Sequence, residues 1–221
     1  MQVYPVRYNL TAQAPTGVMT IRNRGTTNSL FQLGVSKWSQ TGSGEDVLEA
    51  TRDILVNPGL FLLRGSDVQI ARFGLRAAAE PVERSYRVII QEVPQQQLTT
   101  NGLLTLLRVS VPVFVPPTAP IVKKLVWAAR PAKGGIQLLA SNQGNVHFQI
   151  SKIRLLTATG APLSEKVLNA YVLPGAAQII TVEAKAPPAV GAMIQLQAES
   201  DQGDLSETLR VDAAPDAPAR P

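Results

Sequence analysis

Short segments in which apolar and polar residues alternate recur along the whole chain, and they constrain its fold more than any other feature. In the clearest segment, Phe31, Leu33 and Val35 alternate with Gln32, Gly34 and Ser36. The segments are spaced by about 10–15 residues and are separated by turn residues, a pattern typical of β-sandwiches. The sequence therefore predicts an all-β fold.

The expected strands fall into two series on either side of a proline-rich stretch, 113–120. Three prolines within five residues of this stretch stiffen and extend the chain, so it is interpreted as a hinge. We expect an N-terminal domain at 1–117, a C-terminal domain at 118–212 and a disordered Ala/Pro-rich tail at 213–221. The strands are expected at 3–10, 17–23, 30–38, 53–56, 61–64, 67–73, 82–93 and 103–115, then at 124–128, 136–141, 146–156, 170–173, 178–183, 193–199 and 205–211.

The segment 103–115 is nearly continuous apolar sequence and is longer than the usual strand of about 5–6 residues. One face is apolar throughout, whereas the other turns polar after Leu106. Such a nearly continuous apolar run is typical of a strand that is buried on both faces inside a sheet. Pro112 is unusual for a central strand, because proline cannot donate to the hydrogen-bond ladder.

Composition excludes several classes of protein. Charged residues make up only 17% of the 221 residues, too few for a disordered or coiled-coil protein. The formal net charge is +5, but the basic residues are scattered and Lys123-Lys124 is the only adjacent pair, which argues against nucleic-acid binding. No apolar run is long enough for a membrane span of about 18 residues. The N-terminus lacks the pattern of a secretory signal, so we expect either a cytosolic protein or a signal that has been removed.

The inventory of reactive residues favours a protein that is not an enzyme. There is no cysteine, and His147 is the only histidine, so no cofactor and no metal site are expected. His147 lies in an alternating run and is interpreted as a surface or hydrogen-bonded strand residue. No nucleophile elbow, dinucleotide-binding loop or phosphate-binding loop occurs. A site made of paired carboxylates is left open.

The resemblance to a known family rests on the stretches 53–72, 83–94, 142–156, 173–175 and 201–203, in order along nearly the whole chain. These stretches resemble the PapD-like periplasmic chaperones of the chaperone–usher pathway, which assemble pili. The stretch 53–72 (DILVNPGLFLLRGSDVQIAR) resembles the family's proline, glycine turn and Gln-x-x-Arg. The stretch 83–94 (ERSYRVIIQEVP) resembles its strand that ends in Glu-Ile-Pro, and 142–156, 173–175 and 201–203 resemble landmarks of its C-terminal domain. The Tyr86-Arg87 pair and the absence of cysteine look most like the archaic branch.

The resemblance implies two immunoglobulin-like domains in an L shape and a function without catalysis. Such a chaperone binds pilus or fimbrial subunits in the periplasm by donor-strand complementation and delivers them to an outer-membrane usher. It lends a long strand to a subunit that lacks one, because an exposed groove and unpaired edges would otherwise aggregate. The residues placed in the lent strand are Leu103, Thr105, Leu107 and Val109.

The resemblance also implies basic residues that anchor the carboxylate at the end of the bound subunit's chain. Arg7 matches one of them, but Pro112 stands where the family has a lysine. Arg87, and less directly Lys123, are the candidates to replace that lysine. Glu83 and Asp201 match members of the family's interdomain ion-pair cluster.

Two further hypotheses remain at this point. One is a two-domain immunoglobulin-like binding or adhesion module that lends no strand. The other is an enzyme that acts through carboxylates, which a pocket with converging Asp and Glu side chains would support. In the chaperone hypothesis, two free copies of the chain could pair through the same exposed strand edge, and no direct membrane insertion is expected.

Overall fold

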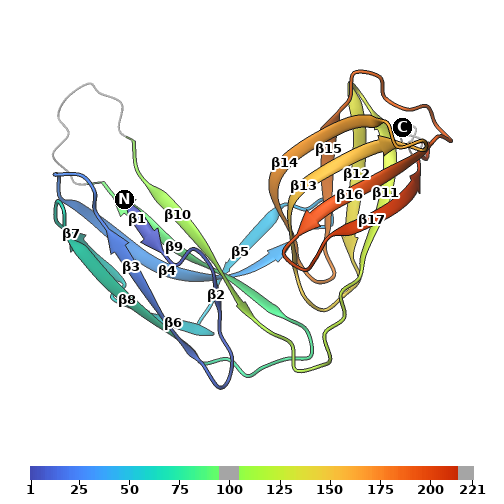
Figure 1. The fold of residues 1–221 in the computed structure, drawn as a ribbon. Helices are drawn as coiled ribbons and strands as arrows, with labels where there is room; N and C mark the ends of the chain where they lie inside the picture. The colour runs from blue at the N-terminus through green and yellow to red at the C-terminus, as the bar shows by residue number, and fades with distance from the viewer. Residues whose placement is uncertain (95–104, 214–221) are drawn as a thin grey trace, which may run out of the picture. The chain divides into compact units, whose positions relative to one another are not determined.

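The computed structural model describes residues 1–94 and 105–213, and every regular element in this part of the chain is a β-strand (Figure 1). Contacts between residues divide the chain into two compact units. The first unit contains Met1–Ser39 and Val47–Ala119, and the second contains Gln40–Asp46 and Pro120–Pro221. The described residues form no helix that could cross a membrane. The predicted all-β fold with two sandwich units is confirmed.

The first unit packs a four-stranded sheet against a six-stranded sheet. The smaller sheet has the order β1-β3-β8-β6, and the larger has the order β2-β10-β9-β4-β5, with β7 also paired to β4. The strands are β1 (Gln2–Tyr4), β2 (Tyr8–Asn9), β3 (Thr16–Arg22), β4 (Ser29–Gln40), β5 (Asp46–Ala50), β6 (Ile54–Asn57), β7 (Leu60–Leu63), β8 (Val68–Leu75), β9 (Arg84–Val93) and β10 (Arg108–Val115).

The core of the first unit follows from the alternation seen in the sequence, because successive side chains of a strand point to opposite faces. Met19 and Ile21 of β3 point inward, as do Ala71 and Phe73 of β8. Gly17 is also buried, and a Cβ atom there would collide with the Phe73 ring. The glycine therefore allows the aromatic side chain to fill the space between the sheets.

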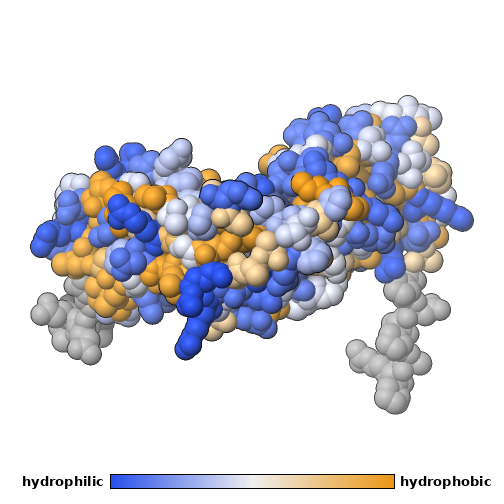
Figure 2. All heavy atoms as spheres, turned by 90° about the horizontal axis from the view of Figure 1, so that it is seen from below, coloured by the Kyte–Doolittle hydropathy of each residue, from blue (hydrophilic) through white to orange (hydrophobic). Residues whose placement is uncertain are grey.

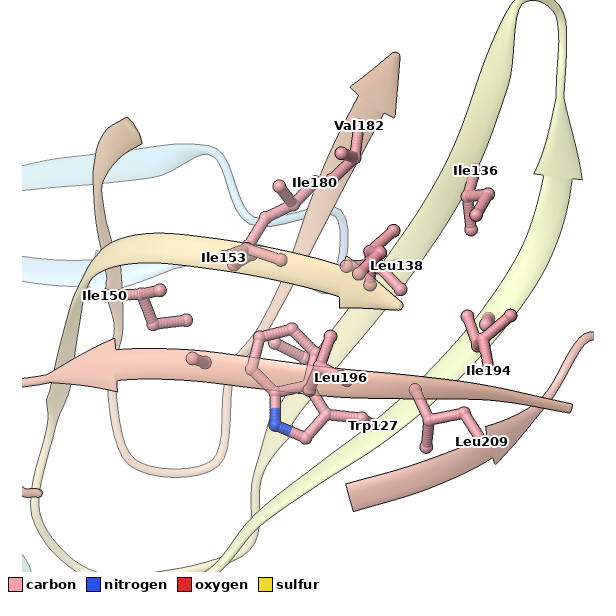
Figure 3. Close-up of a cluster of buried hydrophobic side chains, with 14 of the residues drawn as sticks. Trp127, Ile136, Leu138, Ile150, Ile153, Ile180, Val182, Ile194, Leu196 and Leu209 are labelled. Atoms are coloured by element: carbon pink, nitrogen blue, oxygen red, sulfur yellow. The ribbon is translucent and has the colours of Figure 1, made fainter. Parts of the chain in front are cut away.

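The second unit packs the sheet β11-β12-β15 against the sheet β14-β13-β16-β17. Figure 3 shows its core, in which Trp127, Leu138 and Ile153 come from three different strands. The strands are β11 (Leu125–Ala132), β12 (Gly135–Asn142), β13 (Phe148–Thr157), β14 (Pro162–Val172), β15 (Ala177–Glu183), β16 (Met193–Ser200) and β17 (Leu205–Arg210).

The segment 40–46 is the tip of the β4–β5 hairpin, and it belongs to the second unit. The Gln40 side chain explains this placement. Its Nε2 donates to the Tyr171 carbonyl at 3.0 Å, and its Oε1 accepts from the Leu173 N–H at 2.9 Å. One side chain thus hydrogen-bonds the end of β14 as both a donor and an acceptor. The sequence pattern alone does not indicate that 40–46 contributes to the second unit.

Two predicted strands differ most from the structure, and one observed strand was not predicted. The expected strand at 3–10 is two strands, because β1 pairs with β3 in one sheet and β2 pairs with β10 in the other. Pro5 lies in the break between them and has no N–H to continue the ladder. β5 was not predicted, and β14 is much longer than the predicted 170–173. The adjacent charged residues Glu165 and Lys166 interrupt the apolar–polar alternation that would have indicated a strand there. β6 ends at Asn57, one residue beyond the predicted strand 53–56.

Candidate partner-binding strand edge

β10 has one side that no described strand covers over most of its length. β9 pairs with all eight residues of β10, from Arg108 to Val115. On the other side β2 pairs in parallel, but only with Val113 and Phe114. We call the side of Arg108, Val109 and Ser110 that faces away from β9 the open edge. An open edge of this kind presents backbone groups that can pair with another chain.

The direction of the backbone groups along β10 follows from two hydrogen bonds. The Leu107 carbonyl accepts from the Glu92 N–H at 2.8 Å and therefore faces β9. The Phe114 carbonyl accepts from the Leu10 N–H at 2.8 Å and therefore faces away from β9. Because backbone groups alternate along an antiparallel pair, even-numbered residues direct their N–H and C=O groups outward. Arg108 and Ser110 thus supply the backbone donors and acceptors of the open edge.

Burial along β10 increases toward the C-terminal end of the strand. The strand is buried on both faces at its end, where Val113 and the 1%-exposed Phe114 point to opposite sides. Before the strand begins, Leu106 and Leu107 are 39% and 44% exposed. The segment 103–115 is therefore buried on both faces only in its second half, which packs in its own unit. The described apolar residues of its first half face solvent.

The four residues predicted for the lent strand lie in different settings. Leu103 lies outside the described residues. Thr105 is exposed and precedes β10, and Leu107 is the large exposed residue immediately before the strand. Val109 packs partly against the core of its own unit. Of the described members, Leu107 therefore has the most apolar surface to offer a partner.

Glu92 holds Leu107 beside β9, a contact that the sequence analysis missed. The Glu92 carboxylate accepts from the Leu107 N–H at 3.1 Å, and the Glu92 N–H donates to the Leu107 carbonyl. The pair continues the β9–β10 register one residue beyond the strand. It could have been found only by aligning 83–94 with 103–115 as antiparallel neighbours.

Two of the three predicted anchor residues lie against aromatic rings of the larger sheet. The Arg7 guanidinium lies 5.0 Å from the centroid of Phe114, and the Arg87 guanidinium lies 3.5 Å from that of Trp38. The two rings are themselves 6.0 Å apart. Arg87 is also the register partner of Pro112. Both cations are thus held near the end of the open edge by cation–π contacts.

Lys123, the third candidate, belongs to the second unit. Its Nζ donates to the Gln202 carbonyl at 3.3 Å, and the residue is exposed. The structure therefore brings Arg7 and Arg87 onto one sheet and does not bring Lys123 onto it.

Glu83 and Asp201, predicted for an interdomain cluster, lie in different units. Asp201 accepts from the Gln149 N–H at 2.7 Å, and its second oxygen lies 3.1 Å from His147 Nε2. His147 is only 2% exposed. Of the two interpretations made from the sequence, the hydrogen-bonded strand residue therefore applies, and the surface residue does not. Among the described residues, no three or more His, Asp or Glu side chains are grouped to hold a metal.

A buried tyrosine fixes β9 beside the predicted site, and the sequence analysis did not single out its partners. The Tyr86 hydroxyl donates to Asp53 at 2.8 Å, and Arg84 lies 3.5 Å from the same carboxylate and 3.4 Å from Glu80. Burial and the neighbouring Asp53 raise the pKa of Tyr86 above its ordinary value. The hydroxyl therefore stays protonated and keeps its donor role.

Solved structures show the same fold at low sequence identity. The archaic Csu chaperone CsuC of Acinetobacter baumannii, solved in complex with the CsuE tip adhesion subunit, matches with a TM-score of 0.66 and 18% identity, covering 97% of this chain and 99% of that chain. The SafB chaperone in complex with the SafA pilin of Salmonella enterica matches with 0.61 and 19%, covering 94% and 95%. The Pseudomonas aeruginosa CupB2 chaperone matches with 0.58 and 16%, covering 95% and 100%.

Sequence comparison identifies the family. No curated protein matches the chain. The family model for the N-terminal domain of PapD, described as a pili and flagellar-assembly chaperone, matches residues 1–120, more than half of the chain. This is a family of chaperones and not of enzymes. The chain therefore belongs to the PapD-like pilus-assembly chaperones of the chaperone–usher pathway.

Proposed function

We propose that this chain is a periplasmic chaperone that holds pilus or fimbrial subunits by donor-strand complementation and passes them to an outer-membrane usher. The open edge of β10, with exposed Leu107 before it, is the observation that supports this function best. A strand of the pilin can pair with the backbone of Arg108 and Ser110, while its neighbouring groove receives Leu107. Two free copies of the chaperone can use the same edge to pair with each other.

Apolar contact supplies the affinity in this mechanism. Burying one leucine is worth about 1.5–3 kcal/mol before the cost of association. Leu103, Thr105, Leu107 and Val109 remain the proposed contact residues. Because Val109 already packs partly against the core of its own unit, Leu107 is expected to contribute more to the affinity than Val109.

The substitution Leu107→Glu tests the proposal, because it places a charge where the pilin needs an apolar side chain. Co-expressed with its pilin, the variant should fold normally and lose the complex, with affinity reduced roughly 100-fold or more. Val167→Glu is the matched control, since Val167 is 76% exposed on β14 of the second unit. A folded Leu107→Glu variant that still retains the pilin would show that the strand assignment is wrong, and a plain binding module would then account for the fold better.

Arg7 and Arg87 are proposed to bind the pilin's C-terminal carboxylate, with Arg87 in place of the family's lysine. Arg87 is favoured over Lys123, because it is the register partner of Pro112. Hydrogen bonds to a charged group are worth about 1.5–3 kcal/mol, so Arg87→Ala should weaken binding of a peptide from the pilin C-terminus roughly 10- to 100-fold. The loss should vanish when the peptide ends in an amide. A larger loss with Lys123→Ala would instead assign the anchor to Lys123.

A further inference from the structure

β17 is the last strand of its sheet in the second unit, and one of its sides has no strand beside it among the described residues. On the other side, β16 pairs with all six of its residues, 205–210. The unpaired side is joined to β11 only past the end of the strand. There Val211 bridges Ala129, and the Asp212 N–H donates to the Ala129 carbonyl at 2.9 Å.

The outward backbone groups of β17 follow from the hydrogen bonds at its end. The Val211 N–H donates to the Ala192 carbonyl at 2.9 Å and therefore faces the β16 side. Because backbone groups alternate along an antiparallel pair, the even-numbered residues of β17 direct their N–H and C=O groups away from β16. These residues are Ser206, Thr208 and Arg210, and all three are exposed. We call this side of the strand the β17 edge.

Glu207 is a charged residue on the inner face of this edge strand. The alternation of β17 places it between Leu205 and Leu209, which both pack against the core of the second unit. Its register partner on β16 is the buried Leu196. No described residue forms a hydrogen bond or ion pair with the Glu207 carboxylate. Burial raises the pKa of Glu207 above its ordinary value, so the carboxylate has already lost part of its water.

We infer that Glu207 closes the β17 edge to strand pairing with a second copy of this chain. A strand added beside β17 would lay its own inward side chains over Glu207 and remove the water that still solvates the carboxylate. Covering an ionised carboxylate that has no partner is costly, and inward-pointing charges protect edge strands in this way. The inward side chain beside the open edge of β10 is the apolar Val109. The inference goes beyond the proposed function and does not depend on it, because it concerns the second unit alone.

The substitution Glu207→Val tests the inference by removing the charge from the inner face. It is made in the full chain carrying Leu107→Glu, so that pairing through β10 is disfavoured. By analytical ultracentrifugation, the double variant should self-associate at least roughly tenfold more tightly than the Leu107→Glu chain. The amides of Ser206 and Thr208, followed by NMR, should exchange at least roughly tenfold more slowly in the associated form. Glu199→Val in the same chain is the matched control, since Glu199 is exposed on β16, which is paired on both sides.

Two results would overturn the inference. One is a folded Glu207→Val chain that remains as monomeric as the Glu199→Val chain. The other is association that leaves the Ser206 and Thr208 amides exchanging freely, because the contact would then lie outside the β17 edge. Should the valine variant not fold, Glu207→Gln decides by the same two measurements, since it removes the charge and keeps the length of the side chain. None of these results involves a pilin, so they leave the proposed function to its own test.

Discussion

The two units are both β-sandwiches, yet the edge strands of their sheets are bonded to neighbouring strands to different extents. In the second unit, side chains of edge strand β14 hydrogen-bond the backbone of edge strand β15, from Ser164 to Glu183 and from Lys166 to Thr181. The end of β17 meets β11 through a bridge between Val211 and Ala129. In the first unit, β2 covers only two residues of β10 and leaves the rest of that side without a described strand.

Exposed apolar residues follow the same division. Most of the large apolar side chains that face solvent lie in the first unit, and Figure 2 shows many of them on one face. Leu106 and Leu107 are among them and lie directly before the open edge. Both units have complete cores, so the sandwich fold does not by itself require this exposure. The open edge and the exposed apolar residues before it thus belong to the first unit. Together they favour a binding partner for that unit.

The largest expected effect on the free energy of unfolding comes from placing a proline on the side of β10 that faces β9, and not on the open edge. Val111 directs its N–H toward β9, whereas Ser110 directs its N–H outward. Val111→Pro should lower the free energy of unfolding by about 1–3 kcal/mol or more, because it leaves a buried carbonyl on β9 without a donor. Ser110→Pro should change it little, since edge strands tolerate proline on the solvent side.

Urea unfolding of the two variants provides this measurement. Equal destabilisation by both substitutions would contradict the assignment of Ser110 to the outward side. It would also remove the contrast between β10 and the joined edges of the second unit.

A smaller loss of stability is expected when a hydrogen bond between the edge strands β14 and β15 of the second unit is removed. Ser164→Ala removes the hydroxyl that donates to the Glu183 carbonyl and leaves Lys166 as the nearby side-chain link. A typical hydrogen bond contributes about 0.5–1.5 kcal/mol, so the midpoint of unfolding should fall by a correspondingly modest amount. Calorimetry checks the stability, and an unchanged unfolding temperature would show that this link does not hold the two edges together.

Much of the fold could be predicted because alternation and turn residues report directly on buried strands. β6 ends within one residue of the predicted strand 53–56, and the inward residues Phe31 and Leu33 lie in the core. The first strand was predicted as one because Pro5 was not weighed as a break between two sheets. β14 was underestimated because the adjacent charged residues Glu165 and Lys166 interrupt the alternation of apolar and polar residues.

The candidate site could be predicted only in part. The residues of the lent strand were identified by resemblance, but the role of Glu92 beside Leu107 depends on which strands are neighbours. The burial of Phe114 depends likewise on Arg7 and Trp38, which are distant in the sequence. Such contacts are set by topology, which local periodicity does not encode.

The affinity of the Ser110→Pro variant for its pilin tests the central claim most directly. This substitution removes one outward donor from the open edge and adds no charge. If β10 lends its edge, the variant should keep its unfolding midpoint and bind the pilin roughly tenfold or more weakly. Binding as tight as that of the unsubstituted chain, with the fold intact, would contradict strand lending through β10.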